Sequence, residues 1–470
     1  MALHEAKSEP EGDLDVNPLY VRLEEVPVPR HSMPRLGMLP DTALQVVRDE
    51  LILDGNARLN LATFVTTWME PQAKQLMAEC LDKNMIDKDE YPQTAELERR
   101  CVNILANLWH APGTTSAMPA ATGCSTTGSS EACMLGGMAL LWRWRARRRA
   151  AGASAAAPNL VMGANVQVCW EKFCRYWQVE PRLVPMAEGR LHLTGPGAAA
   201  RCDENTIGVV AVMGSTMDGS YEPVRLISEE LDRLQKSRGH DVPIHVDGAS
   251  GGFVAPFLQP SLEWDFRVPR VASINASGHK YGLVYPGVGW VVWRDASALP
   301  DDLVFRVNYL GGDMPTFALN FSRPGSQVAA QYYNFLRLGF EGYSRVQQAS
   351  QDVAMHLSSK IAAMGPFELL TDGSDLPVFA FRLRDPAGTY TVFDLSERLR
   401  ERGWLVPAYT FPADLQDMAV IRIVVRNGFS MDLAEAFLDD LRTQTEVLAA
   451  HPGPPVPLLP EGSQRGGFAH

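Results

Sequence analysis

The sequence predicts an α/β fold, in which a large domain with a mostly parallel sheet precedes a smaller α+β domain. Between residues 159 and 295, short apolar segments alternate with amphipathic helical patterns, which is typical of βαβ units. Beyond residue 365, a second and shorter set of apolar and helical segments follows. We divide the chain into four segments: an N-terminal arm (1–57), a large domain (58–345), a small C-terminal domain (346–450) and a mobile tail (451–470).

Strands of the large domain are expected in short, mostly apolar segments between the helical patterns, because a parallel strand is buried on both faces. These segments are 159–163, 206–214, 243–247, 271–277 and 289–295. Helices are expected where apolar residues recur at helical spacing, at 96–111, 129–150, 165–177 and 222–239. The helix at 129–150 begins with two serines and Glu131 and ends in arginines, so its charges complement the helix dipole.

The small domain follows a long helical pattern between residues 327 and 365. This pattern is interrupted at GFEGYSR, residues 339–345, where glycines favour a break. Beyond it, strands are expected at 377–383, 404–411 and 419–426, and helices at 391–403 and 432–451. The two ends of the chain are rich in proline, which predicts an irregular arm and a mobile tail.

Composition excludes several classes of function. The 470 residues contain 43 Lys and Arg against 55 Asp and Glu, a formal net charge of −12. Such a chain repels polyanions, so nucleic acid is not an expected partner. Because no apolar run suits stable membrane insertion and the N-terminus shows no apolar signal core, we expect a cytoplasmic protein. Seven scattered cysteines without a CxxC pair predict reduced, buried thiols, and no metal site is expected.

Lys280 is the first candidate for a chemical role. It follows an apolar strand directly, in a turn of small residues and beside His279. A lysine that is desolvated in such a turn has a lowered pKa and becomes a nucleophile, which suits a Schiff base with an aldehyde cofactor. Taken alone, a lysine in a loop is more often a solvated surface residue.

Two further signals complete a constellation around this lysine. Asp247 ends an apolar strand, and in α/β sheets ligands bind at that edge. Ser129 and Ser130 open a helix, where backbone N–H groups and hydroxyls form an anion site, although an ordinary helix cap has the same pattern. An anion cradle, a carboxylate for a ring nitrogen and an amine for an aldehyde together meet the needs of pyridoxal 5′-phosphate (PLP).

Longer strings then make a resemblance to one family specific. The chain resembles glutamate decarboxylases of the bacterial and plant type, which belong to the PLP-dependent group II decarboxylases, from about residue 40 to about 450. The strings that carry it are ATFVTTWMEP, DKNMIDKDEYPQTAELERRCVNILANLWHAP, GSSEACMLGGMALLWRWR, DENTIGVV, HVDGASGGFVAPF, SGHKYGL and NFSRPGSQV. The resemblance implies PLP as cofactor, L-glutamate as substrate, and 4-aminobutanoate (GABA) and CO₂ as products, with one proton consumed.

The same resemblance implies a fold and a set of cofactor residues. The fold is fold-type I, similar to aspartate aminotransferase, with a mostly parallel seven-stranded sheet in the large domain and a site completed by a homodimer; hexamer formation stays open. The implied roles are Lys280 for the Schiff base, Asp247 for the ring nitrogen, Gln167 and Ala249 for the ring faces, Thr216 near the ring oxygen, Ser129, Ser130, Ser277 and His279 for the phosphate, and Ser322 for the neighbouring subunit's phosphate.

Substrate residues also follow from the resemblance. It assigns Thr63 and Phe64 to the distal carboxylate, Asn84 and Asp87 to entry from the partner subunit, and Arg422 to the α-carboxylate. An arginine on an otherwise apolar strand also fits a buried ion pair. The resemblance also implies that His470, in the terminal GGFAH, closes the site as pH rises, and histidine titrates near neutral pH; a disordered tail is the alternative. Two other functions stay open: a decarboxylase for another acidic amino acid such as aspartate, and a catalytically silent scaffold.

Overall fold

The computed structural model describes residues 29–113, 121–308 and 314–450. The chain divides into two compact units, Met1–Ala57 and Arg58–His470. In the first unit, helix α1 (Pro40–Leu51) begins at a proline and carries Asp41 in its first turn and Arg48 in its last. Its ends therefore complement the helix dipole, but none of its residues is buried. Everything described below belongs to the second unit.

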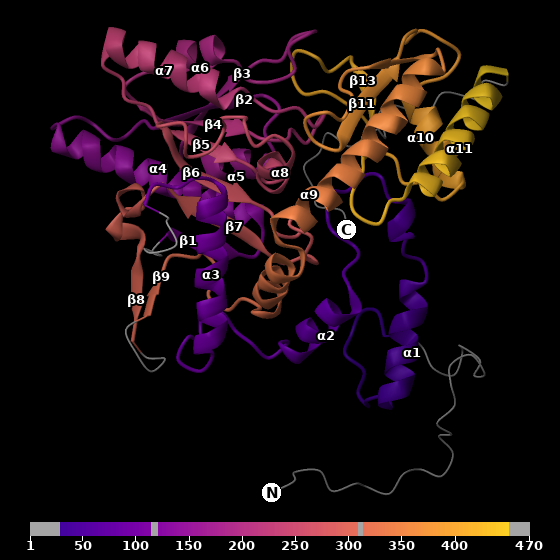
Figure 1. Cartoon of the computed structure of the whole chain (residues 1–470), viewed down its shortest axis with the longest axis horizontal. Coiled ribbons are helices and arrows are strands. Elements are labelled where there is room, and N and C mark those ends of the chain that lie inside the picture. Colours follow the sequence, from indigo (N-terminus) through magenta and orange to yellow (C-terminus); the bar gives the residue numbers. More distant parts are fainter. Residues whose placement is uncertain (1–28, 114–120, 309–313, 451–470) are drawn as a thin grey trace, which may run out of the picture. The chain divides into compact units, whose positions relative to one another are not determined.

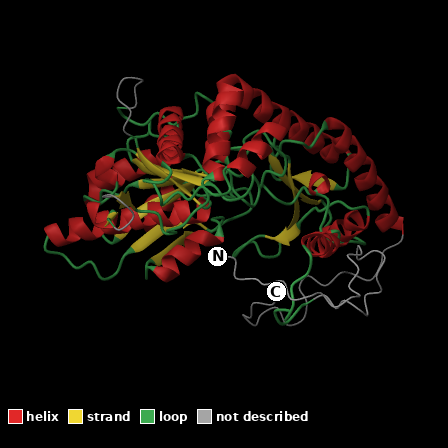
Figure 2. Cartoon of the chain, turned by 90° about the horizontal axis from the view of Figure 1, so that it is seen from below, coloured by secondary structure: helices red, strands yellow, loops and turns green. Residues whose placement is uncertain are grey.

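The second unit contains two main sheets (Figures 1 and 2). The larger is seven-stranded, in the order β1-β7-β6-β5-β4-β2-β3. Its strands are β1 (Thr122–Thr126), β2 (Asn159–Gly163), β3 (Glu180–Val184), β4 (Thr206–Val212), β5 (Ile244–Asp247), β6 (Val271–Ala276) and β7 (Gly289–Trp293). The pairings from β3 through β2, β4 and β5 to β6 are parallel, and those of β7 with β6 and β1 are antiparallel. The predicted α/β fold with a mostly parallel sheet is confirmed.

Helices cover both faces of this sheet. They include α3 (Pro92–Leu108), α4 (Ser129–Ala150), α5 (Val168–Tyr176), α6 (Gly195–Arg201), α7 (Val224–Arg238) and α8 (Ala255–Leu258). A further helix, α2 (Pro71–Glu79), packs on the long helix α9 (Ser326–Ala363). Along β4, Val210 and Val212 belong to the apolar cluster formed with α4 and α5. Val209 and Ala211, which point the other way, belong to the cluster formed with α3 and α7. Burial on both faces explains why the central strands have mostly apolar sequences.

The smaller sheet is four-stranded and antiparallel, in the order β10-β11-β13-β12. Its strands are β10 (Phe367–Leu369), β11 (Val378–Leu383), β12 (Ala408–Thr410) and β13 (Ala419–Val424), and it packs with α10 (Val392–Glu401) and α11 (Met431–Ala450). A further pair, β8 (Phe305–Val307) with β9 (Met314–Thr316), stands apart from both sheets (Figure 1). None of the helices in the described ranges combines the length and apolar character that crossing a bilayer requires.

Helix α9 (Ser326–Ala363) contacts both halves of this unit, packing on α2 and α3 at one end and on β10 and β11 at the other (Figure 1). Gly339 interrupts it with φ 59° and ψ −172°. Because that left-handed φ favours glycine, the predicted break within residues 339–345 is confirmed.

The structure departs from the sequence prediction in several places. Besides β1 and β3, six helices and strands of this unit had no predicted counterpart: α2, α6, α8, β8, β9 and β10. β1 and β3 were not expected, because they are the edge strands of the large sheet and lack continuous apolar sequences. Of the strand expected at 404–411, only β12 (Ala408–Thr410) joins the small sheet. Leu405 forms an isolated parallel β-bridge with Asn60, in the segment before α2. The helix expected from residue 165 begins at Val168, where Gln167 acts as the N-cap.

Candidate active site

A cavity of about 320 Å³ lies at the carboxyl ends of the central parallel strands. Every predicted cofactor residue except Ser322 lines it. The full lining is Thr127, Gly128, Ser129, Ser130, Glu131, Cys133, Asn165, Gln167, Cys169, Val212, Gly214, Thr216, Asp247, Ala249, Ser277, His279 and Lys280. The alignment of β4, β5 and β6 explains this convergence, because Asp247 is level with Val212 on one side and with Asn275 on the other.

Lys280 lies in the turn that follows β6. The Thr66 backbone N–H donates to the His279 carbonyl at 2.8 Å, and the Thr66 hydroxyl donates to the Lys280 carbonyl at 2.6 Å. These bonds hold the lysine backbone while its amine lies 5.1 Å from the centre of the Phe64 ring. Burial, the largest effect, lowers the pKa of Lys280, which favours the neutral and nucleophilic amine.

Asp247 ends β5 and is only 4% exposed. Its carboxylate accepts hydrogen bonds from Trp170 Nε1 at 2.9 Å, from Asn275 Nδ2 at 3.1 Å and from the Ala249 backbone N–H at 3.1 Å. The Cys133 thiol donates to the same carboxylate at 3.6 Å. This buried and oriented carboxylate can hold a proton on a heteroaromatic ring nitrogen.

The opposite end of the cavity is built to receive an anion. Ser129 begins the 22-residue helix α4, so free backbone N–H groups face the cavity there, and its hydroxyl lies 2.5 Å from that of Ser277. His279 Nδ1 is buried and has no hydrogen-bond partner among the described residues. Burial and then the charge of Lys280 lower the pKa of His279 to about 4. The N–H groups of α4 and the serine hydroxyls fit a phosphate, with the unpartnered His279 nitrogen in the same lining, so the residues present fit PLP.

The remaining predicted cofactor residues also have defined contacts. The Gln167 side chain accepts from the Cys169 backbone N–H at 2.6 Å and so begins α5 beside the cavity. The Ala249 carbonyl accepts from the Ser277 backbone N–H at 3.0 Å, which joins the loop after β5 to the lysine turn. The Thr216 carbonyl accepts a hydrogen bond from Arg422 Nη1.

Arg422 extends from β13 of the small sheet toward the cavity and is 9% exposed. Its Nη2 donates to the Ala62 carbonyl at 2.6 Å, and its guanidinium carbon lies 5.0 Å from the centre of the Phe64 ring. Its Nε has no partner among the described residues. Among the described residues, no carboxylate lies within ion-pair distance of Arg422. The buried ion pair that was the alternative for Arg422 is therefore not formed with any of them.

The segment before α2 carries the predicted substrate residues Thr63 and Phe64, and it places Phe64 beside Lys280 of the cavity lining. Phe64 is buried between Lys280 and Arg422, whereas the Thr63 side chain is exposed. Arg426 Nε donates to the Thr63 carbonyl at 3.1 Å, and its Nη2 donates to a second carbonyl of the segment, at residue 60, at 2.8 Å. Sequence reasoning missed Arg426, which holds the segment that carries Thr63 and Phe64.

Six predicted residues of the described chain are outside the cavity lining. Thr63, Phe64 and Arg422 belong to the segments described above, in which Phe64 and Arg422 contact lining residues. The other three are Asn84, Asp87 and Ser322. Asn84 Nδ2 donates to Ser322 Oγ at 3.2 Å, and the Asp87 backbone N–H donates to the Asn84 carbonyl at 3.2 Å. The structure therefore brings these residues together at a separate place. His470 lies outside the described residues.

Glu222 supports the cavity from behind its lining, and no pattern in the sequence predicts this role. It is buried, and its carboxylate accepts from the Val212 backbone N–H at 2.7 Å, the Leu193 backbone N–H at 2.9 Å and Asn165 Nδ2 at 3.0 Å. It thereby holds the carboxyl end of β4 and an asparagine that lines the cavity. Nothing near it in the sequence indicates this role, because its partners are distant along the chain.

Glu222 is expected to make stability depend on pH. Burial raises its pKa from 4.5 to about 7, so folding favours the protonated form. Its contribution is complete below pH 4.5 and is lost as pH rises through 7, so the free energy of unfolding should fall by roughly 3 kcal/mol between these limits. Urea unfolding at pH 5 and pH 8 should show a smaller difference for Glu222→Gln than for the parent. The exposed Glu204→Gln serves as control; equal pH dependence in all three proteins would contradict the prediction.

The fold and the cavity together define a class of PLP-dependent enzymes. A family model for the pyridoxal-dependent decarboxylase conserved domain matches residues 29–384, and the chain belongs to this family. A sphingosine-1-phosphate lyase of Burkholderia pseudomallei shares the fold, with a TM-score of 0.76 over 91% of this chain and 95% of that one, at 21% identity. The large domain is therefore of fold-type I.

Within this family, the chain is similar to glutamate decarboxylases. It is 56% identical to that of Aliivibrio fischeri over 429 residues, which cover 90% of this chain and 91% of the relative. It is 51% identical to that of Solanum lycopersicum, over 94% of this chain and 87% of the relative. The solved glutamate decarboxylase of Lactobacillus brevis has a TM-score of 0.88 and 47% identity, and covers 93% of this chain and 99% of that one.

Proposed function

We propose that this protein is a PLP-dependent glutamate decarboxylase, which converts L-glutamate to 4-aminobutanoate and CO₂ and consumes one proton. The observation that carries the proposal is that Lys280 and Asp247 line one cavity while Arg422 donates to the carbonyl of a third lining residue, Thr216. The similarity to glutamate decarboxylases over most of the chain supports the choice of substrate. The amine of Lys280, the carboxylate of Asp247 and the guanidinium of Arg422 are all present, which argues against a catalytically silent scaffold.

The residues divide the work at the cofactor. When bound, PLP accepts the electron pair that the departing CO₂ leaves on the α-carbon. Lys280 would hold the cofactor's aldehyde carbon through its amine, and Asp247 would keep a proton on the ring nitrogen. Ser129, Ser130 and Ser277 would donate to the phosphate with the N–H groups of α4, and His279 would stand beside them. Gln167 and Ala249 would enclose the ring, with Thr216 near its oxygen.

Substrate binding is assigned to groups around Phe64. Arg422 would bind the α-carboxylate, because its guanidinium is fixed by carbonyls on two segments and still has an unpaired Nε. Thr63 and Phe64 would lie at the distal carboxylate. Because the Phe64 ring packs between Lys280 and Arg422, it would also limit access of water to the reacting carbon.

We also propose a homodimer, in which Asn84, Asp87 and Ser322 reach the partner's cavity. Two observations support it: none of these residues lines the cavity of its own chain, and the neighbouring Leu319 and Phe321 are each 43% exposed. Apolar side chains at that exposure favour coverage by a second chain. A fully active monomer in sedimentation would contradict this proposal.

A cytoplasmic location is the remaining part of the proposal. All seven cysteines are free thiols in the structure, and all but Cys80 are buried. Free thiols in this number are typical of a reducing compartment.

A comparison of two substrates tests the proposed reaction. With PLP present, release of CO₂ and formation of GABA should follow addition of L-glutamate, and kcat/KM should exceed that for L-aspartate by about 100-fold or more. Aspartate is one methylene shorter, so it cannot engage the α- and distal carboxylate sites together. Preferred turnover of aspartate would assign another substrate, and bound PLP without turnover of either amino acid would favour the silent scaffold.

A further inference from the structure

Glu131 is a carboxylate in the wall of the cavity at the end proposed for the phosphate. A negative charge beside a phosphate is unfavourable unless nearby hydrogen-bond donors or positive charges offset it, because like charges repel. Glu131 is 7% exposed, and it lies in the first turn of α4, directly after Ser129 and Ser130. The sequence pattern assigns it only to the helix dipole.

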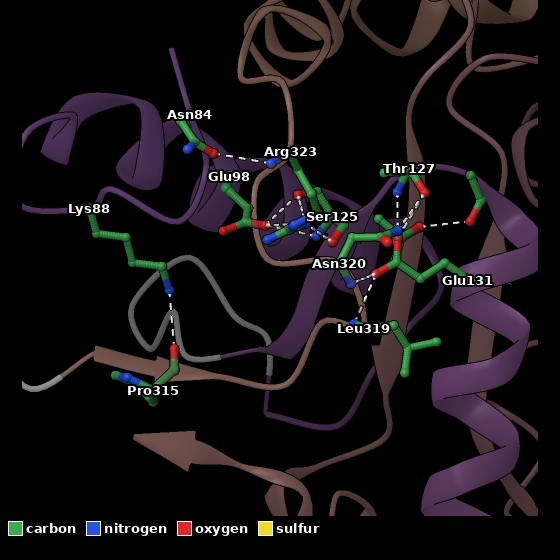
Figure 3. A network of polar contacts seen from close by, with 12 residues as sticks. Asn84, Lys88, Glu98, Ser125, Thr127, Glu131, Pro315, Leu319, Asn320 and Arg323 are labelled. Atoms are coloured by element: carbon green, nitrogen blue, oxygen red, sulfur yellow. Dashed lines mark hydrogen bonds and ion pairs between the residues drawn. The ribbon is translucent and has the colours of Figure 1, made fainter. Parts of the chain in front are cut away.

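Five donors surround this carboxylate (Figure 3). Its Oε2 accepts from the Thr127 backbone N–H at 2.8 Å, the Thr127 hydroxyl at 2.9 Å and Asn320 Nδ2 at 3.1 Å. Its Oε1 accepts from the backbone N–H groups of Leu319 at 3.0 Å and Asn320 at 3.1 Å. Glu131 thus joins the turn before α4 to a segment nearly 190 residues later in the chain.

A second buried carboxylate reinforces the same junction. Glu98 Oε1 accepts from the Ser125 backbone N–H at 2.9 Å and from the Ser125 hydroxyl at 2.5 Å. Arg323 donates through Nη1 to the Ser125 carbonyl and lies 3.9 Å from Glu98 (Figure 3). The segment 319–323 is therefore fastened to both sides of the turn that begins α4.

We propose that Glu131 is a positioning residue for the phosphate end of the cofactor, an inference that rests on the proposed function. Its carboxylate binds the N–H groups of Thr127, Leu319 and Asn320 and so holds the turn at residues 127–130 in a shape that leaves the α4 N–H groups free for the phosphate. With all five donors directed at it, its own charge is compensated locally.

Glutamine cannot replace Glu131 in this arrangement. In either orientation of the amide, its NH₂ group faces at least one backbone N–H, of Thr127 or of Leu319 and Asn320. The matched control is Glu98→Gln, because both Ser125 donors meet the same oxygen, which an amide carbonyl can supply. The two variants remove the same charge from the same network but differ in whether its donors stay paired.

The test titrates the full-length protein, freed of cofactor, with PLP and with pyridoxal, which lacks the phosphate. We expect Glu131→Gln to raise the Kd for PLP by roughly 10- to 100-fold, because paired donors lose a charged acceptor. The Kd for pyridoxal should change less than about threefold, as should both values for Glu98→Gln. A general loss of structure would weaken both ligands equally, so the ratio of the two Kd values isolates positioning of the phosphate end.

Other outcomes would overturn the inference. Equal weakening of PLP and pyridoxal would make Glu131 a residue of general stability, and tighter PLP binding by Glu131→Gln would show that its charge acts only by repulsion. If Glu131→Gln does not fold, the exposed Asn320→Ala, which removes one donor to Glu131, should still weaken PLP selectively by a few-fold; unchanged PLP affinity would then contradict the inference. Failure of the parent protein to bind PLP would instead contradict the proposed function.

Discussion

Replacement of Lys280 by alanine is expected to reduce decarboxylation by at least about 10³-fold. The amine is the only lysine amine in the described cavity lining, and burial lowers its pKa, which favours the neutral form. Alanine keeps the backbone carbonyl that accepts from the Thr66 hydroxyl, so the turn after β6 should persist. The measurements are the rate of GABA formation and the absorbance band of the lysine-bound cofactor, and both should be lost.

Lys172→Ala provides the control for this variant. Lys172 is exposed on α5, outside the cavity lining, and its replacement should leave both the rate and the absorbance band close to those of the parent. Retention of normal activity by Lys280→Ala would overturn the assignment of the nucleophile and, with it, the proposed reaction.

Replacement of Asp247 by asparagine is expected to lower kcat by about 10²- to 10³-fold. Asparagine cannot hold a proton on the cofactor's ring nitrogen as a carboxylate does. Its amide would also face a donor in either orientation, because Trp170 Nε1 points at Oδ2, and Asn275 Nδ2 and the Ala249 N–H point at Oδ1. The measurement is kcat at saturating glutamate together with the cofactor content of the purified variant.

Asp218→Asn is the matched control for Asp247→Asn. Asp218 is also a buried aspartate beyond the end of a central strand, but the Ser220 backbone N–H and hydroxyl both donate to its Oδ1, which an amide oxygen can replace. Burial raises the pKa of Asp218, so loss of its charge should cost little. A similar fall in kcat for both variants would show that Asp247 acts through packing and not through the ring nitrogen.

The strands were predictable from the sequence where helices cover both faces of the sheet. β4, β5 and β6 are covered on both faces and every residue in them is buried, so their sequences are mostly apolar and predict strands directly. β1 and β3 form the edges of the sheet, where one side of the ladder is unpaired, and their mixed sequences carry no such pattern. The polar residue Gln167 likewise gave no sign that it caps α5 instead of lying inside it.

The sequence by itself determined which chemical groups the site could contain, because Lys280, Asp247 and Ser129 each follow a local pattern at a strand end or a helix start. Only the tertiary structure decided which distant groups meet them. Phe64 and Arg422 come from segments more than 140 residues from Lys280, and the five donors to Glu131 come partly from residues 319–320. Local patterns report the propensity and burial of neighbouring residues, whereas the partners of a side chain depend on packing between segments that are remote along the chain.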